Sequence, residues 1–421
     1  MGLVKINQIS PGMALAEDLR DSRGRFLVPS GVGLTARDIR VLKMWGVVEA
    51  DIQGIGTDGV EDAAAREIDP SLMEMAEKVV TRQFRYADAD HPAVHELRRL
   101  CILRKAEEMQ RRKDDGVGGT GLIEEDRDSD EIPKLNIDAV DFQKLIQSHI
   151  LELPTLPMIS LKMHETIARP NSSANDIARV ISRDTTLSAR LLKIVNSAFY
   201  RFPSRIDSVS RAVAIIGTKQ LTTLASGVAI INMFRNIPSS IIDMKSFWKH
   251  SVRCGVHARI IASYHGVQNT ERPFLSGLLH DIGRLILYNY APDHAVYALT
   301  KAKRAQNLLR GIECEDLEFD HAETGGQLLK RWKLPVLVED AVRYHHNPWE
   351  SQNSLEPSIV HLADIMANAV GVGSSGERFV PPLDAGAWEV IGLSANVLEV
   401  IMKQADRHTE EIFTFFYSDE D

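Results

Sequence analysis

Cysteine is scarce in this chain, and its three cysteines lie far apart. Cys101, Cys254 and Cys314 form no CxxC pair, so the sequence indicates neither a disulfide framework nor a cysteine-type zinc site. Isolated, reduced thiols are typical of proteins in a reducing compartment. We therefore expect a cytoplasmic protein.

Long apolar runs and an excess of positive charge are missing as well. No window approaches 18 uninterrupted apolar residues, so no membrane-spanning helix is expected. The N-terminus lacks the basic head and apolar stretch of a signal peptide, and Ile6 stands where myristoylation favours Ser or Thr. The formal net charge of −9 makes the chain a poor general binder of nucleic acid or anionic membrane. We expect neither as a partner.

What is present divides the chain into four stretches. Residues 1–53 combine short strand-like runs, Gly and Pro turns and one helix that Thr35 can cap and Gly46 can end, which predicts a small β-rich module. Residues 66–113 carry strong helix formers opened by prolines, which predicts a helical connector. Residues 114–133 are Gly-rich and acidic, as in a linker, and their GVGGTG run lacks the Lys-Ser or Lys-Thr of a phosphate-binding loop.

The remainder, residues 134–421, is predicted to be helical throughout. Apolar residues recur at intervals of three and four, helix starts carry Ser, Asp or Pro, and breaks carry Pro or Gly. The fold class expected is therefore mainly α: an all-α domain with a C-terminal helical extension, preceded by the small β-rich module and the connector. Within the domain the periodicity predicts single helices over residues 208–234, 274–288 and 315–332.

A histidine and an aspartate stand side by side in the apolar run LLHDIGR, residues 278–284. On one helix His280 and Asp281 would project about 100° apart, so both could reach one ion while the carboxylate bridges to a second. Imidazole and carboxylate ligands suit divalent zinc, manganese, iron, nickel or cobalt, and two bridged ions are a common apparatus for phosphoester hydrolysis. Further candidate ligands beside apolar runs are His250, His321, His345, His346 and Asp364.

Each candidate also has a purely structural interpretation. A buried His–Asp pair can be held by hydrogen bonds alone, and a lone histidine in a helix is more often a satisfied core or surface residue. We interpret five further histidines in that way: His164, His257, His265, His294 and His408. The seven candidates together favour a metal site.

The order of these residues resembles the HD superfamily of metal-dependent phosphohydrolases. The stretches around them resemble the HDOD family, HD-related output domains of bacterial signalling proteins, over roughly residues 143–350. These stretches include LPTLPMISLKMHETI, ARVISRDTTLSARLLKIVNSAFY, IDSVSRAVAIIGTKQLTTLA, FLSGLLHDIGRLIL and HAETGGQLLKRWKLPVLVEDAVRYHH. The N-terminal run VKINQISPGMALAEDLRDSRGRFLVPSG is similar to a module found ahead of HD-GYP cyclic di-GMP phosphodiesterases.

The resemblance implies a helical signal-transduction domain. HDOD domains have often lost the HD ligands, whereas this sequence retains positions that match them all. By analogy with HD proteins, one ion, of iron, nickel, manganese or zinc, would be held by His250, His280, Asp281 and Asp364. Asp281 would bridge to a second ion held by His321, His345 and His346.

The chain departs from HD-GYP enzymes at two points. The double histidine is followed by NPWES with no Gly-Tyr-Pro, and Arg284 replaces the lysine that those enzymes place after the HD pair. An arginine can still clamp a phosphate, so Arg284 is a candidate catalytic residue if the protein is an enzyme.

Three functions follow from these patterns. The first is a regulatory output domain that binds a protein partner in a signalling pathway or a nucleotide-type ligand and retains an HD-type metal site. The second is a metal-dependent phosphohydrolase acting on a nucleotide or cyclic nucleotide. The third is a nucleic-acid-binding regulator, for which the body offers no basic patch. We favour the first, and the sequence leaves catalytic activity and oligomeric state open.

Overall fold

The computed structural model describes residues 68–115, 158–169, 171–200, 204–234 and 237–417 of the chain. In the N-terminal segment it describes residues 2–6, 9, 12–16, 19–20, 26–31, 33–35, 38–39, 42 and 49–52, and it also describes residues 132 and 202. Most of the predicted linker and the start of the predicted helical domain, residues 134–157, lie outside this part. The chain divides into two compact units. One comprises Met1–Arg82, Ala89–Gly119 and Leu393–Ile401, and the other comprises Gln83–Asp88, Thr120–Gly392 and Met402–Asp421.

The described N-terminal residues form two short antiparallel sheets. Strand β1 (Gly2–Lys5) pairs with β4 (Glu49–Ile52), and β2 (Leu19–Arg20) pairs with β3 (Phe26–Val28). The hydroxyl of Thr35 accepts a hydrogen bond from the Asp38 backbone N–H at 3.2 Å, which confirms the predicted cap. Gly46 lies outside the described residues. The assignment of all of residues 1–53 to a β-rich module, and its resemblance to the module of HD-GYP proteins, stay predictions.

Two helices follow in the stretch predicted as a helical connector. Helix α2 spans Pro70–Gln83 and α3 spans Pro92–Asp114. Each begins at a proline, whose fixed φ and missing N–H suit the first helical position. The ring Nδ1 of His91 accepts a hydrogen bond from the Ala93 N–H at 3.3 Å and caps α3.

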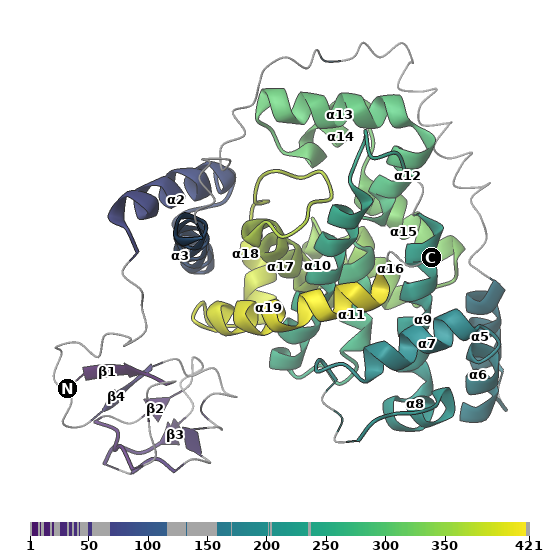
Figure 1. Ribbon diagram of the computed structural model, residues 1–421, viewed down its shortest axis with the longest axis horizontal. Coiled ribbons are helices and arrows are strands. Elements are labelled where there is room, and N and C mark those ends of the chain that lie inside the picture. The colour runs from purple at the N-terminus through teal and green to yellow at the C-terminus, as the bar shows by residue number, and fades with distance from the viewer. Residues whose placement is uncertain are drawn as a thin grey trace. The chain divides into compact units, whose positions relative to one another are not determined.

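The body of the chain is helix after helix, as predicted (Figure 1). Helices α10, α11, α16 and α17 lie between α5–α8 at one end of this unit and α13 and α14 at the other (Figure 1). The large buried side chains Trp248, Phe247, Phe274 and Tyr288 lie in and around the central helices. The helices are α5 (Met158–Ala168), α6 (Ala174–Ile181), α7 (Thr185–Val195), α8 (Val209–Ile216), α9 (Thr218–Met233), α10 (Met244–His265), α11 (Glu271–Leu279), α12 (Ile282–Tyr290), α13 (Pro292–Ala305), α14 (Leu309–Leu317), α15 (His321–Arg331), α16 (Val336–Arg343), the 3-10 turn η1 (Pro348–Glu350), α17 (Leu355–Val370), α18 (Ala385–Ile391) and α19 (Val397–Phe416).

Two of the three stretches predicted as single helices are broken by a left-handed backbone. Gly217, with φ of +100°, separates α8 from α9, and Glu318, with φ of +49°, ends α14. Asp320 then caps α15, its carboxylate accepting the Ala322 N–H at 2.8 Å. The predictions over 208–234 and 315–332 were wrong because the apolar periodicity resumes after each break, whereas left-handed residues cannot continue a right-handed helix.

Helices that carry the histidines and aspartates approach closely at glycines. A β-carbon at Gly277 of α11 would lie 2.9 Å from the carbonyl oxygen of Cys254 in α10. A β-carbon at Gly283 of α12 would overlap the carbonyl oxygen of His321, the first residue of α15. Only glycine permits backbones to come this near. Gly277 and Gly283 flank the His280–Asp281 pair, so both sides of this pair are held by close helix contacts.

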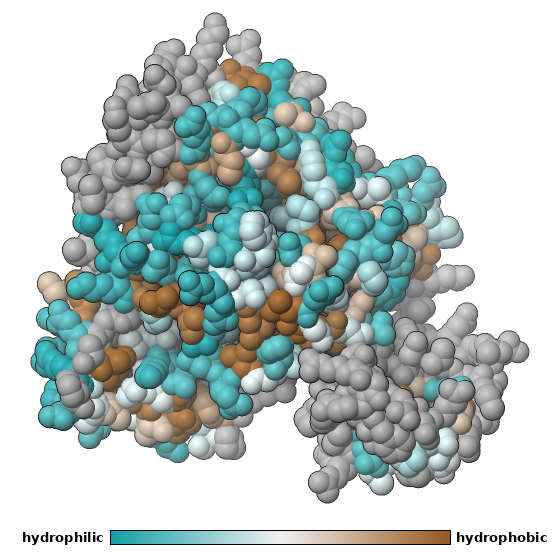
Figure 2. Space-filling view, turned by 180° about the vertical axis from the view of Figure 1, so that it is seen from behind, coloured by the Kyte–Doolittle hydropathy of each residue, from teal (hydrophilic) through white to brown (hydrophobic). Residues whose placement is uncertain are grey.

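The surface is mostly hydrophilic in the upper part of the face shown in Figure 2, and hydrophobic residues gather in groups in its lower part. Among the described residues, large hydrophobic side chains are exposed at Met158, Ile215, Val336, Trp349 and Val390. Within the same residues, no helix combines the length and the apolar character needed to cross a bilayer.

We expect Gly283→Ala to destabilise the fold by about 3 kcal/mol, because the new methyl group would collide with a backbone carbonyl that cannot move without shifting α15. The urea midpoint of unfolding, followed by circular dichroism, measures the effect. Gly311→Ala in α14 is the matched control, since its β-carbon would meet nothing closer than 3.6 Å and alanine favours helices. Equal midpoints for Gly283→Ala and wild type would show that the α12–α15 contact is loose.

Candidate metal centre

The His280–Asp281 pair lies between two helices and not within one. His280 follows the last residue of α11, and Asp281 precedes the first residue of α12. The Asp281 backbone is non-helical, with φ −95° and ψ 13°, and its carbonyl accepts the Arg284 N–H at 2.9 Å. The predicted single helix over 274–288 was therefore wrong. The turn brings the two adjacent side chains together, with His280 Nε2 3.2 Å from Asp281 Oδ2.

Three of the predicted ligands form one group. His250 comes from α10, His280 from the end of α11 and Asp364 from α17. The Asp364 Oδ1 atom lies 3.2 Å from Nε2 of both His250 and His280, and the two Nε2 atoms are 3.4 Å apart. All three side chains are buried. Their ligand atoms lie close enough together to share one ion.

His321, His345 and His346 form a second group. His321 begins α15, and the other two directly follow α16. His321 Nε2 lies 3.0 Å from His346 Nε2, and the rings of His345 and His346 are 4.0 Å apart between centroids. This group too can hold one ion. His346 is the partly exposed member, and the other two are 0% exposed.

Asp281 lies between the two groups and contacts both. Its Oδ2 is 3.2 Å from Nε2 of His280, and its Oδ1 is 3.1 Å from Nε2 of His321. Burial on its own would raise the pKa of Asp281, but the charges of Arg284 and His280 outweigh it and hold this pKa well below its ordinary value. The carboxylate is therefore ionised, with one oxygen for each group, which is the arrangement of a bridging ligand.

The histidines are oriented so that Nε2 is the atom facing the centre. Nδ1–H donates to a backbone carbonyl in His280 (Gly277, 2.8 Å) and in His345 (Val342, 2.7 Å), and to the Glu313 carboxylate in His321 (2.5 Å). A proton on Nδ1 leaves a lone pair on Nε2, which is the usual state of a metal-binding histidine. Nε2 of His345 is buried without a hydrogen-bond partner among the described residues. The donor set, its tautomers and this orphaned nitrogen all fit divalent ions.

Without a bound metal, the candidate ligand histidines differ in their pKa values. Burial, aided by the neighbouring imidazoles, lowers the pKa of His345 to about 3 and that of His346 well below its ordinary value, so both are neutral. Burial also opposes the charged form of His280, but Asp281 and the other nearby anionic groups outweigh it and raise the pKa of His280. A proton on His280 therefore competes with a metal ion for the same lone pair.

Arg284 holds Asp281 in place. It is 2% exposed, and its guanidinium donates to Glu313 (Nε to Oε1, 2.9 Å), to Asp281 (Nη1 to Oδ2, 3.1 Å) and to Ser375 (Nη1 to Oγ, 3.0 Å). These contacts give Arg284 a positioning role. To clamp a phosphate, Arg284 would have to use a guanidinium that already makes these hydrogen bonds. Its predicted role as a phosphate clamp stays a prediction.

Four supporting residues escaped the sequence reasoning. Glu313 of α14 binds both His321 and Arg284, Ser375 binds Arg284, and His361 donates to the His345 carbonyl at 2.8 Å. Asn368 donates to Asp364 Oδ1 at 2.8 Å. Asn368 stands four residues after Asp364 on α17, a helical spacing that could have revealed it. His361 stands three residues before Asp364 on the same helix, whereas Glu313 and Ser375 come from segments that only the fold brings near.

Comparison with known proteins agrees with this architecture. The HDOD domain family model matches residues 153–348. Among curated proteins, an uncharacterized protein of Treponema pallidum is 30% identical over 220 residues, covering 52% of this chain and 42% of that protein. Ribonuclease Y of Clostridium botulinum is 31% identical over 121 residues, covering 29% of this chain and 18% of the enzyme. The chain thus spans less than half the length of these relatives.

Solved structures share the fold. An HDOD domain protein of unknown function from Geobacter sulfurreducens superposes with a TM-score of 0.53 at 23% identity, covering 66% of this chain and 98% of that one. A protein proposed to be a phosphohydrolase, from Shewanella amazonensis, gives 0.52 at 22% identity, covering 64% and 97%. Six of the seven candidate ligands fall within the matched stretch, and Asp364 lies beyond it. Residues 153–348 thus match the HDOD domain family model, and the helical body shares its fold with these solved structures.

Proposed function

We propose that this protein is a signal-transduction output protein whose HDOD domain retains a two-ion HD-type metal centre and acts by binding a protein or a ligand. The bridging position of Asp281 between the two histidine groups carries the metal assignment. His250, His280 and Asp364 would hold one ion and His321, His345 and His346 the other. Five imidazoles with two carboxylates suit iron, nickel, manganese or zinc.

Burial of the centre favours a binding role over turnover. His250, His280 and Asp281 are at most 2% exposed, and Arg284 is engaged in buried hydrogen bonds. Of the seven candidate ligands, His346 is partly exposed and the other six are buried. A centre of this kind can stabilise a domain and fix its binding surface.

The bridging geometry also supports a second candidate, a metal-dependent phosphohydrolase acting on a nucleotide or cyclic nucleotide. When bound, two ions would polarise a phosphoryl oxygen and generate hydroxide from water. This chain's own residues would hold the site dry, with Arg284 fixing the Asp281 carboxylate and Glu313 fixing His321. The two candidates differ in whether phosphoester bonds are cleaved.

Metal analysis combined with thermal melting tests the centre. Elemental analysis of protein purified without chelator should show near-stoichiometric metal, and Asp281→Asn should lose it. A chelator should lower the wild-type melting temperature by several degrees, since a metal at about 100 times its dissociation constant stabilises by about 2.7 kcal/mol. The melting temperature of Asp281→Asn should not change with chelator. Asp316→Asn, outside the centre, should behave as wild type. Metal-free wild type that melts identically with and without chelator contradicts the proposal.

Stabilisation by metal should depend on pH with a definite sign. Because the pKa of His280 is raised in the metal-free protein, protons compete with metal at a higher pH than for an ordinary histidine. The chelator-sensitive part of the melting temperature should be full at alkaline pH and shrink as pH falls through neutrality. Melting scans with and without chelator across pH 5–9 measure it. A difference that is constant across this range would show that His280 is not a ligand.

Glu313→Gln should weaken metal binding at the second group by about 10–100-fold, because outer partners of ligating histidines tune affinity by this amount. Competition with a chromogenic chelator measures the loss. Glu339→Gln is the control, since Glu339 pairs with Arg343 away from the centre. Equal retention of metal by both variants would show that Glu313 does not support a ligand.

Cyclic di-GMP should not be turned over, because NPWES follows the double histidine in place of Gly-Tyr-Pro. The assay supplies manganese or iron(II) and follows the linear dinucleotide by chromatography. Turnover at about one per second, within the ordinary enzyme range, would overturn this expectation and favour the phosphohydrolase.

A further inference from the structure

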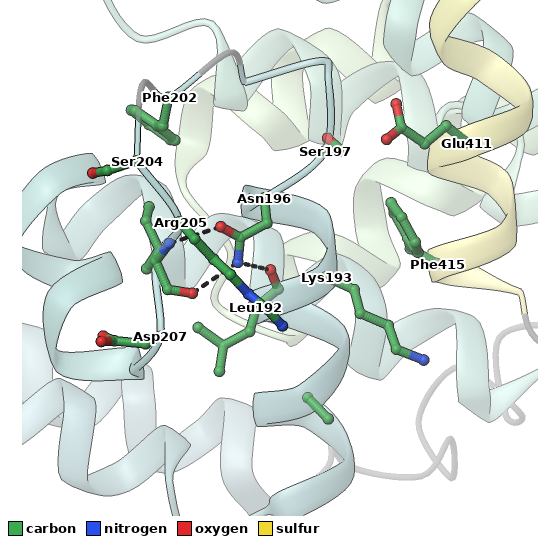
Figure 3. A pocket seen from close by; sticks show the side chains of 12 residues that line it. Leu192, Lys193, Asn196, Ser197, Phe202, Ser204, Arg205, Asp207, Glu411 and Phe415 are labelled. Carbon is green, nitrogen blue, oxygen red and sulfur yellow. Dashed lines mark hydrogen bonds between the residues drawn. The ribbon is translucent and has the colours of Figure 1, made fainter.

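A second concave site lies in the helical body and uses none of the candidate metal ligands. The cavity has a volume of about 820 Å³, within the size range of small-molecule sites. Its walls come from α7, from the loop that follows α7 and from α19 (Figure 3). We call it the Lys193/Arg205 pocket, after its two cationic side chains.

Two cationic and two acidic side chains line the pocket. Of the two acidic side chains, Glu411 accepts the Ala198 N–H at 3.1 Å, and Asp207 lies 3.8 Å from Arg211. Lys193 and Arg205 are exposed and have no ion-pair partner in the described part of the chain. Lys193 and Arg205 are therefore available to contact an anion, whereas Asp207 faces Arg211 and Glu411 accepts a backbone N–H.

A buried hydroxyl in the wall also lacks a partner. Ser197 is 4% exposed, lines the pocket, and its Oγ makes no hydrogen bond within the described residues. Buried polar atoms are nearly always paired. This oxygen has almost no accessible surface, so a ligand would reach it only after the wall moved.

Hydrogen bonds connect the parts of the pocket wall in the absence of a ligand. Asn196 joins α7 to the loop through three hydrogen bonds, to the Leu192 carbonyl (2.7 Å) and to the Ile206 carbonyl (2.8 Å) and N–H (2.7 Å), as Figure 3 shows. Further along the loop, Tyr200 donates to Glu271 of α11 at 2.6 Å, and the Arg259 guanidinium lies over the Tyr200 ring at 4.4 Å. A preformed wall spares a ligand the cost of ordering it.

Aromatic rings complete the lining. Phe202 belongs to the loop and stacks on Tyr200, with ring centroids 6.0 Å apart at 18°, and Phe415 is contributed by α19. Both are half-buried. A planar ring can stack on such side chains.

We propose that the Lys193/Arg205 pocket binds a nucleotide-type ligand: Lys193 and Arg205 contact its phosphate, and its base packs on Phe202 or Phe415. The site is independent of the metal centre. The proposal therefore stands whether or not that centre holds metal or cleaves phosphoesters.

Calorimetric titration of the full chain with adenosine and guanosine 5′-monophosphates tests the pocket. At least one should bind at least tenfold more tightly than its nucleoside or inorganic phosphate. The Lys193→Gln/Arg205→Gln double variant should lose at least tenfold in affinity, and Phe415→Leu should weaken the nucleotide more than phosphate. Lys219→Gln, an exposed lysine of α9 outside the pocket, should bind as wild type.

Asp281→Asn and chelator-treated protein should bind the nucleotide as wild type does, which separates this pocket from the metal centre. Absence of binding by both nucleotides overturns the proposal. So does binding that survives the double variant but is lost in Asp281→Asn, since the nucleotide would then occupy the metal centre. Phosphate binding as tight as nucleotide binding reduces the pocket to an anion site and also overturns the proposal.

Discussion

The ionised carboxylate of Asp281 is the feature on which the centre depends. Its two oxygens contact histidines of the two groups, at 3.2 Å and 3.1 Å. A buried negative charge is costly unless it is paired and hydrogen-bonded. Arg284 supplies the pairing, and Glu313 and Ser375 fix Arg284 in turn. The candidate centre is thus a charge network built around one side chain, which also explains why an arginine is buried there.

Backbone geometry places that side chain. The turn between α11 and α12 lets His280 and Asp281 reach the same centre, although they are adjacent in sequence. Glycines at 277 and 283 allow α10 and α15 to approach the turn from both sides. The close contact at Gly283 is with His321, a candidate ligand of the second group. The packing of α12 on α15 therefore also positions this candidate ligand.

The candidate metal centre and the Lys193/Arg205 pocket share no residues, but they are linked through α10 and α11. The loop that walls the pocket is anchored on α10 and α11 through Arg259 and Glu271, and these helices also bring His250 and His280 to the centre. If the protein acts as the signalling domain proposed above, this link would join a ligand pocket to the buried ion pairs of the centre.

The sequence by itself determined the helical class, the HDOD resemblance and the seven candidate ligands, because apolar periodicity and the HD pattern are local signals. The seven side chains do come together, in two groups joined by Asp281. Only the tertiary structure decided the helix breaks at Gly217, Glu318 and the HD pair, since periodicity continues across a turn. The tertiary structure alone also revealed the role of Glu313, the burial of Arg284 and the pocket. These features depend on contacts between residues far apart in the chain, and a single sequence has no regular spacing that predicts such contacts.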